Sequence, residues 1–193
     1  MKDPAIRLIL KETELSNFIN DPHSKVVHEL KLPVAKAIID IAVINGSLHG
    51  YEIKSSSDTL QRLPNQLIAY SYIFDYITVV TERKYCDKII ELVPDWVGVA
   101  ICSDKVCSKG FEVIKPSSLN LNKKGFYVAK LLWRDELVEI LEEQQIVFRK
   151  KSRNWTLCEI LSDNLELSKL SDIVREKLKQ RSDWKIKEGY AVV

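Results

Sequence analysis

The chain has 193 residues, which suits one compact domain with a terminal extension and leaves too little length for two full domains. Hydrophobic residues make up 46% and charged residues 29%, and this composition excludes the disordered and fibrous classes of protein. No apolar run is long enough to cross a bilayer, and the N-terminal residues lack the apolar stretch of a secretory signal. We therefore expect a soluble, cytoplasmic protein that does not contact a membrane.

The formal net charge of +2 is unevenly distributed along the chain. Residues 1–100 carry 11 Lys and Arg against 13 Asp and Glu, whereas residues 101–193 carry 18 against 14. The second half contains one dense basic cluster, formed by Arg149, Lys150, Lys151 and Arg153. We expect this cluster to contact nucleic-acid phosphates, and a solvated helix face is the alternative.

The N-terminal part predicts one helix followed by three strands. Apolar residues at helical spacing, after Pro4, predict a helix over residues 4–18. Three segments rich in β-branched residues follow and predict strands, at residues 25–32, 36–44 and 48–54. The segment Asn45-Gly46-Ser47 favours a tight hairpin between the last two. The middle strand is apolar on both faces except for Asp40, which indicates a central strand covered on both sides.

The rest of the chain alternates between helices and strands and then becomes mainly helical. Helices are predicted from Pro64 to about Phe74 and over residues 84–92, and strands are predicted at 75–81, 96–102 and 111–115. This order predicts an α/β fold with a mixed β-sheet flanked by helices. We divide the chain into a core, residues 1–130, and a helical, basic C-terminal extension packed on it, residues 131–193.

Polar residues gather at the end of the predicted hairpin. Side chains alternate along a strand, so Glu52 and Lys54 share one face with Gly50. A two-residue turn would point Asp40 away from Glu52, whereas a three-residue loop over residues 45–47 sets Asp40 directly opposite Glu52. A bulge at Gly50 would have the same effect. We expect one of these two devices, with the Cβ atoms of the two acids about 5 Å apart.

Two close carboxylates on a buried sheet repel each other and lose hydration unless a cation lies between them. Mg²⁺ or Mn²⁺, which binds carboxylate, carbonyl and water oxygens, satisfies both acids. Lys54 would then lie beside a water and a phosphate. The structural alternatives are a buried Asp40 that pairs with Lys36 and a simple cross-strand ion pair of Glu52 with Lys54.

Two motifs in this region resemble those of a known enzyme family. Asp40, followed on the next strand by Glu52-Ile53-Lys54, resembles the active site of the PD-(D/E)XK nuclease superfamily, although Ile39 stands where the motif has its proline. Gln66 and Tyr70, four residues apart on the next predicted helix, resemble the QxxxY motif of the RecB-like branch. The segment that contains both motifs also resembles a group of small, uncharacterised bacterial proteins of this superfamily.

The resemblance implies a restriction-endonuclease-like fold and a Mg²⁺-dependent (or Mn²⁺-dependent) phosphodiesterase, a hydrolase that cleaves nucleic acid, with DNA as the favoured substrate. It implies metal ligation by Asp40, Glu52 and the carbonyl of Ile53, and catalytic roles for Asp40, Glu52, Lys54 and Gln66. The superfamily's additional acidic residue has Glu29 as its first candidate here, with Glu12 or Glu14 behind it. We also expect nucleic-acid contacts from Arg62 and Tyr70.

Two other functions fit the same residues. One is a non-catalytic DNA-binding or regulatory module on the same fold. The other is a nuclease toxin or defence component that a partner protein controls. All of these functions have nucleic acid as a partner, and the sequence leaves a homodimer and a regulatory protein partner as alternatives.

Overall fold

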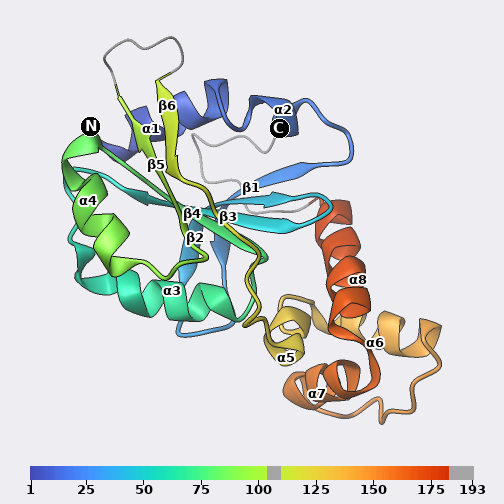
Figure 1. Ribbon diagram of the computed structural model, residues 1–193. Helices are drawn as coiled ribbons and strands as arrows, with labels where there is room; N and C mark the ends of the chain where they lie inside the picture. Colours follow the sequence, from blue (N-terminus) through green and yellow to red (C-terminus); the bar gives the residue numbers. More distant parts are fainter. Residues whose placement is uncertain (104–109, 183–193) are drawn as a thin grey trace.

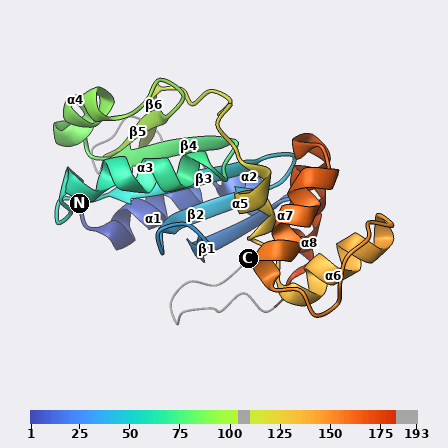
Figure 2. The ribbon, with the colours of Figure 1, turned by 90° about the horizontal axis from the view of Figure 1, so that it is seen from below.

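The structure is a computed structural model that describes residues 1–103 and 110–182. A six-stranded mixed sheet is flanked by helices, as the sequence predicts (Figures 1 and 2). The strand order in the sheet follows the chain, from β1 (Lys25–Lys31), β2 (Ile38–Ile44) and β3 (Leu48–Lys54) to β4 (Tyr76–Thr81), β5 (Gly98–Cys102) and β6 (Phe111–Lys115). Strands β3, β4 and β5 are parallel, and the other neighbouring pairs are antiparallel.

Helices cover both faces of the sheet. Figure 1 shows α1 (Asp3–Glu12) and α2 (Ser16–Ile19) on one side and α3 (Leu63–Ser71) on the other. The 3-10 turn η1 (Leu60–Arg62) leads into α3, and α4 (Arg83–Leu92) follows β4. The prediction of one helix over residues 4–18 is wrong, because the chain leaves the helical conformation at Thr13. The Thr13 hydroxyl donates to the carbonyl of Ile9 at 2.6 Å, a local bond that competes with a continuing helix.

Four helices pack together at one end of the sheet, namely α5 (Gly125–Ala129), α6 (Arg134–Glu143), α7 (Asn154–Asn164) and α8 (Leu167–Gln180) (Figure 2). A buried ionic network ties them to the sheet. Asp75, just before β4, lies 2.5 Å from Lys123 Nζ and 3.6 Å from Arg175 Nη1 of α8, and it accepts the N–H of Leu48 at 2.8 Å. No helix within the described ranges is long and apolar enough to cross a membrane.

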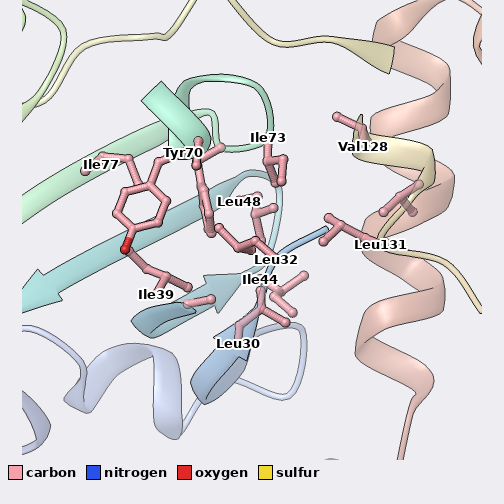
Figure 3. Packing of buried hydrophobic residues seen from close by; sticks show 14 of the residues in the cluster. Leu30, Leu32, Ile39, Ile44, Leu48, Tyr70, Ile73, Ile77, Val128 and Leu131 are labelled. Atoms are coloured by element: carbon pink, nitrogen blue, oxygen red, sulfur yellow. The ribbon is translucent and has the colours of Figure 1, made fainter. Parts of the chain in front are cut away.

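The sheet carries one apolar cluster on each face. Figure 3 shows part of the larger cluster, in which the ring of Tyr70 lies among apolar side chains that include Ile39 and Ile77. Gly50 of β3 permits this packing, because a Cβ atom there would lie 2.6 Å from Ile77 Cδ1 and 3.2 Å from Ile39 Cγ1. A side chain at this position would require Ile77, Ile39 or Phe74 to shift.

The β2–β3 hairpin has the three-residue loop that is one of the two devices expected from the sequence. Ile44 pairs with Leu48, and Gly50 pairs with Ala42 in regular register without a bulge. The loop is closed by Asn45, whose side-chain Oδ1 accepts the N–H of Ser47 at 2.8 Å and whose own N–H donates to the Ser47 carbonyl at 3.0 Å. Of the two devices expected from the sequence, the loop is the one the chain uses.

Candidate active site

Asp40 lies where the backbone pairing of β2 with β3 ends. The last paired residues are Ile41 and Tyr51. One position further on, the Asp40 side chain replaces the backbone as the acceptor, because its Oδ2 takes the N–H of Ile53 at 2.8 Å. A backbone N–H inside a sheet requires an acceptor, and here a carboxylate supplies it. Asp40 is thereby joined to the strand that carries Glu52 and Lys54.

The pairing of β1 with β2 is interrupted at the same position. His28 pairs with Ile41 and Leu30 pairs with Ile39, but Glu29, which faces Asp40 in this register, has a φ of 53°. Ile41 packs in the cluster beneath α1 and α2, whereas Ile39 packs in the cluster beneath α3. The regular alternation of side chains between the two faces of the sheet is therefore broken at Asp40. The Asp40 side chain bonds to β3 and α1 rather than entering either apolar cluster.

Arg7 of α1 is the cation beside Asp40, and sequence analysis did not identify it. Its Nη2 lies 2.7 Å from Asp40 Oδ1, and its Nη1 donates to the Asp40 carbonyl at 3.1 Å. The Arg7 side chain is only 7% exposed, and its Nε also pairs with Asp3 at 2.6 Å. Lys36, the partner considered from the sequence, is exposed instead. The signal for Arg7 was a charged residue beside Ile6 on the buried face of an amphipathic helix.

Glu52 is the centre of a buried polar cluster. Its Oε1 lies 2.7 Å from Lys54 Nζ, and the two side chains are 3% and 5% exposed. The same Oε1 accepts Gln66 Nε2 at 2.8 Å, and Gln66 Oε1 accepts Lys54 Nζ at 2.8 Å. Tyr70 Oη lies 2.7 Å from Glu52 Oε2. The acid, the lysine and both residues of the helical motif thus form one hydrogen-bonded group.

Tyr70 has a different role from the one expected. Its side chain is completely buried, so it does not reach nucleic acid. Its hydroxyl proton is shared between Glu52 Oε2 and the carbonyl of Ile38, 2.9 Å away. Burial and the neighbouring Glu52 carboxylate raise the pKa of Tyr70, which keeps the hydroxyl protonated as a donor. Tyr70 positions the carboxylate of Glu52.

The two carboxylates influence each other electrostatically. Burial and, after it, the negative charge of Glu52 raise the pKa of Asp40 to about 7. The Ile53 N–H and the Arg7 guanidinium act in the opposite direction but offset only part of this effect. A cation placed between two acids on neighbouring strands relieves such repulsion.

Asp40 and Glu52 supply carboxylate oxygens, the ligand type that hard divalent cations prefer, and each of these four oxygens already accepts a hydrogen bond from the chain. Glu29 does not join them. Within residues 1–103 and 110–182, no three His, Cys, Asp or Glu side chains lie close enough to share a metal ion. The left-handed backbone at Glu29 interrupts the β1 ladder at this position. Glu14 accepts the hydroxyl of Tyr51 at 2.9 Å in the contacts beneath α1, and therefore does not replace Glu29.

The remaining predicted residues lie in two places. Arg62 is exposed in η1, four residues before Gln66. The four basic residues are exposed between α6 and α7, namely Arg149, Lys150, Lys151 and Arg153. Figures 1 and 2 both place these helices at the end of the molecule opposite the N-terminus. The N-terminus lies close to Lys54, because the Met1 carbonyl accepts the N–H of Ser56 at 3.1 Å. The basic segment, at the opposite end of the molecule, is therefore remote from the Glu52 cluster.

Comparisons with known proteins identify the family. Protein cII of Enterobacteria phage P4 is 28% identical over 156 residues, which are 81% of this chain and 59% of that relative. The chain thus spans less than two thirds of the length of this relative. A solved structure, a protein of unknown function from Silicibacter pomeroyi, has a TM-score of 0.42 and 15% identity over 68% of this chain and 86% of that protein. The sequence model of the family described as bacteriophage P4 protein cII matches residues 3–188, and the chain therefore belongs to this family.

Proposed function

We propose that this protein is a metal-dependent nuclease of the PD-(D/E)XK type, which hydrolyses phosphodiester bonds of nucleic acid, with DNA as the favoured substrate, in the cytoplasm. One observation carries the proposal. The motif residues of β3 and α3 come from separate segments of the chain. Lys54 of β3 and both motif residues of α3, Gln66 and Tyr70, nevertheless contact the carboxylate of Glu52 at distances of 2.7–2.8 Å.

Each side chain of the cluster has a defined task in this proposal. Asp40, Glu52 and the carbonyl of Ile53 are the groups that would hold Mg²⁺ or Mn²⁺, which would polarise the scissile phosphate as a Lewis acid. Gln66 and Tyr70 fix the orientation of Glu52. The ammonium group of Lys54, held by Glu52 and Gln66, orients the attacking water and offsets negative charge on the phosphate. The guanidinium of Arg62, exposed before α3, contacts the nucleic-acid backbone.

A non-catalytic nucleic-acid-binding module is the second candidate, and one observation favours it. Both acids already have a cationic partner from the chain, Arg7 beside Asp40 and Lys54 beside Glu52. Such pairs neutralise the two acids without any bound ion. In this alternative the cluster stabilises the fold, and the protein binds nucleic acid without cleaving it.

Nuclease assays distinguish the two candidates. Purified protein is incubated with circular and linear, single- and double-stranded DNA and RNA in the presence of Mg²⁺, Mn²⁺ or EDTA. We expect metal-dependent cleavage by the wild type and a loss of at least about a hundredfold in Asp40→Ala and Lys54→Ala. The matched control is Glu139→Ala with Lys177→Ala, which removes an ion pair of 2.8 Å between α6 and α8.

A binding measurement completes the test. Titration calorimetry with Mn²⁺ is expected to detect uptake by the wild type and by the Glu139/Lys177 control, and none by Asp40→Ala. Nucleic-acid binding without cleavage of any substrate, together with no uptake of Mn²⁺, would establish the non-catalytic module instead.

A further inference from the structure

We propose that helices α6 and α7 carry a binding surface for single-stranded nucleic acid, separate from the Glu52 cluster. The surface consists of the α6–α7 loop with its basic residues and of two exposed tryptophans, Trp133 and Trp155. It goes beyond the proposed nuclease activity, because it binds whether or not the protein cleaves.

Arg134 gives the basic loop a defined shape. Its guanidinium donates to the carbonyls of Lys150 (2.6 Å) and Ser152 (2.9 Å) and to the side chain of Asn154 (2.8 Å). A loop held at three points loses less conformational entropy when a ligand binds it than a free loop would. The backbone that carries the loop cations is therefore ordered before any ligand arrives.

Trp133 is a rigid, half-exposed aromatic surface. The guanidinium carbon of Arg181 lies 4.1 Å from the centre of its ring, and Arg181 is itself fixed by Glu136 and by the carbonyl of Leu131 at 2.9 Å. The ring is nevertheless 49% exposed. A large aromatic group that is held in place and left in contact with water is suited to stacking against a planar ligand.

Trp155 adds a second aromatic group beside the same loop. It is 50% exposed in the first turn of α7. Asn154 precedes it in the chain, and Arg134, which follows Trp133, binds Asn154, so one hydrogen bond links the segments that carry the two rings. The loop between the helices also exposes Val147 to 93%. The segments that carry the two aromatic rings and the basic residues are therefore linked to one another.

Three of the five acidic residues of α6 already pair with cations, and Asp135 and Glu143 are the other two. Glu136 pairs with Arg181, Glu139 pairs with Lys177, and Glu142 pairs with Lys150. No ion pair within the described residues involves three of the loop cations, Arg149, Lys151 and Arg153. These three loop cations complement a phosphate backbone.

Exposed aromatic rings select the single-stranded form of the ligand. In a duplex the base faces are stacked on one another, whereas a single strand can place them on indole rings while its phosphates meet the cations. This stacking does not depend on base sequence. DNA and RNA share this chemistry, and the test below includes both.

Fluorescence anisotropy in EDTA measures binding without cleavage. The probes are labelled oligothymidylate and oligouridylate of about 20 nucleotides and a duplex of the same length. We expect single strands to bind more tightly than the duplex, and Trp155→Ala to weaken binding about fivefold to a hundredfold. Trp155→Phe retains most of the affinity. Arg149→Gln with Lys151→Gln weakens binding and lowers its salt dependence.

Matched controls separate these effects from general loss of charge or apolar surface. Leu121→Ala removes another apolar side chain, 86% exposed, and Lys84→Gln with Lys88→Gln removes two exposed charges on α4. Both controls are expected to bind the single strands like the wild type. Wild-type affinity in Trp155→Ala, tighter binding of the duplex, or no binding of any single strand would each overturn the proposal. These outcomes are independent of whether cleavage occurs.

Discussion

The carboxylate of Asp40 accepts the backbone N–H of Ile53 across a distance of 2.8 Å, beyond the last backbone pair of β2 with β3. This bond joins an acid of one strand to the segment between Glu52 and Lys54 of the next. It occurs where β1 also loses its regular pairing, at Glu29. The irregular part of the sheet is thus the part that gathers the candidate catalytic groups.

Asp40 is expected to make folding stability depend on pH. Its pKa rises from 3.8 to about 7 in the folded protein, chiefly because of burial. The folded state therefore keeps this proton to a higher pH than the unfolded state does. The stabilisation that protonated Asp40 gives the folded state is fully present below about pH 4 and is lost as the pH rises to about 7. Urea unfolding at pH 5 and pH 8 should show that the wild type loses ~2–4 kcal/mol relative to Asp40→Asn over this interval. An unchanged difference at the two pH values contradicts the expectation.

The Glu52–Lys54 pair is expected to be strongly coupled, because both side chains are almost fully buried. Lys54→Met leaves the Glu52 carboxylate without its cation and should lower the free energy of unfolding by ~3–5 kcal/mol. Glu52→Gln added to Lys54→Met should recover most of this loss in a double-mutant cycle. The control is Arg83→Met, since Arg83 pairs with Glu112 at an exposed position and its loss should cost less than ~1 kcal/mol. Equal costs for the two pairs would refute the buried pairing.

Tyr70→Phe tests the positioning of Glu52. The ring remains in the apolar cluster, but Glu52 Oε2 loses a donor at 2.7 Å, so we expect a loss of ~1–3 kcal/mol in the free energy of unfolding. If the protein is a nuclease, cleavage should also fall at least about tenfold. Tyr72→Phe is the matched control, because the Tyr72 ring stacks on Tyr127 and lies outside the Glu52 cluster. Thermal unfolding and plasmid nicking by both variants provide the comparison, and equal behaviour of the two would exclude the role given to Tyr70.

Gly50→Ala tests the close packing of Ile77 and Phe74 against β3. The added methyl would lie 2.6 Å from Ile77 Cδ1 and 3.2 Å from a ring carbon of Phe74, so overpacking should cost ~1–3 kcal/mol. Gly46→Ala in the hairpin loop meets no atom within 4 Å and should change stability by less than ~0.5 kcal/mol. Chemical denaturation of both variants measures the difference. A Gly50→Ala protein as stable as Gly46→Ala would show that the sheet can absorb the methyl.

The sequence by itself determined the local features of this protein. Strand positions and the loop of Asn45 follow from residue type and short-range backbone geometry, and they predicted the β2–β3 register, which is observed as far as the pair Ile41 and Tyr51. Helical spacing likewise predicted that Gln66 and Tyr70 lie on one face of α3, where both now contact Glu52. These relationships span a few residues or a single hairpin, so they need no knowledge of how distant segments pack.

Only the tertiary structure decided which groups surround the two acids. Arg7 is 33 positions from Asp40 and meets it because α1 packs on that face of the sheet. The burial of Tyr70 and the left-handed backbone of Glu29 depend in the same way on contacts among several elements at once. Such contacts are set by packing across the whole core, whereas residue spacing reports only the geometry of one helix or one strand.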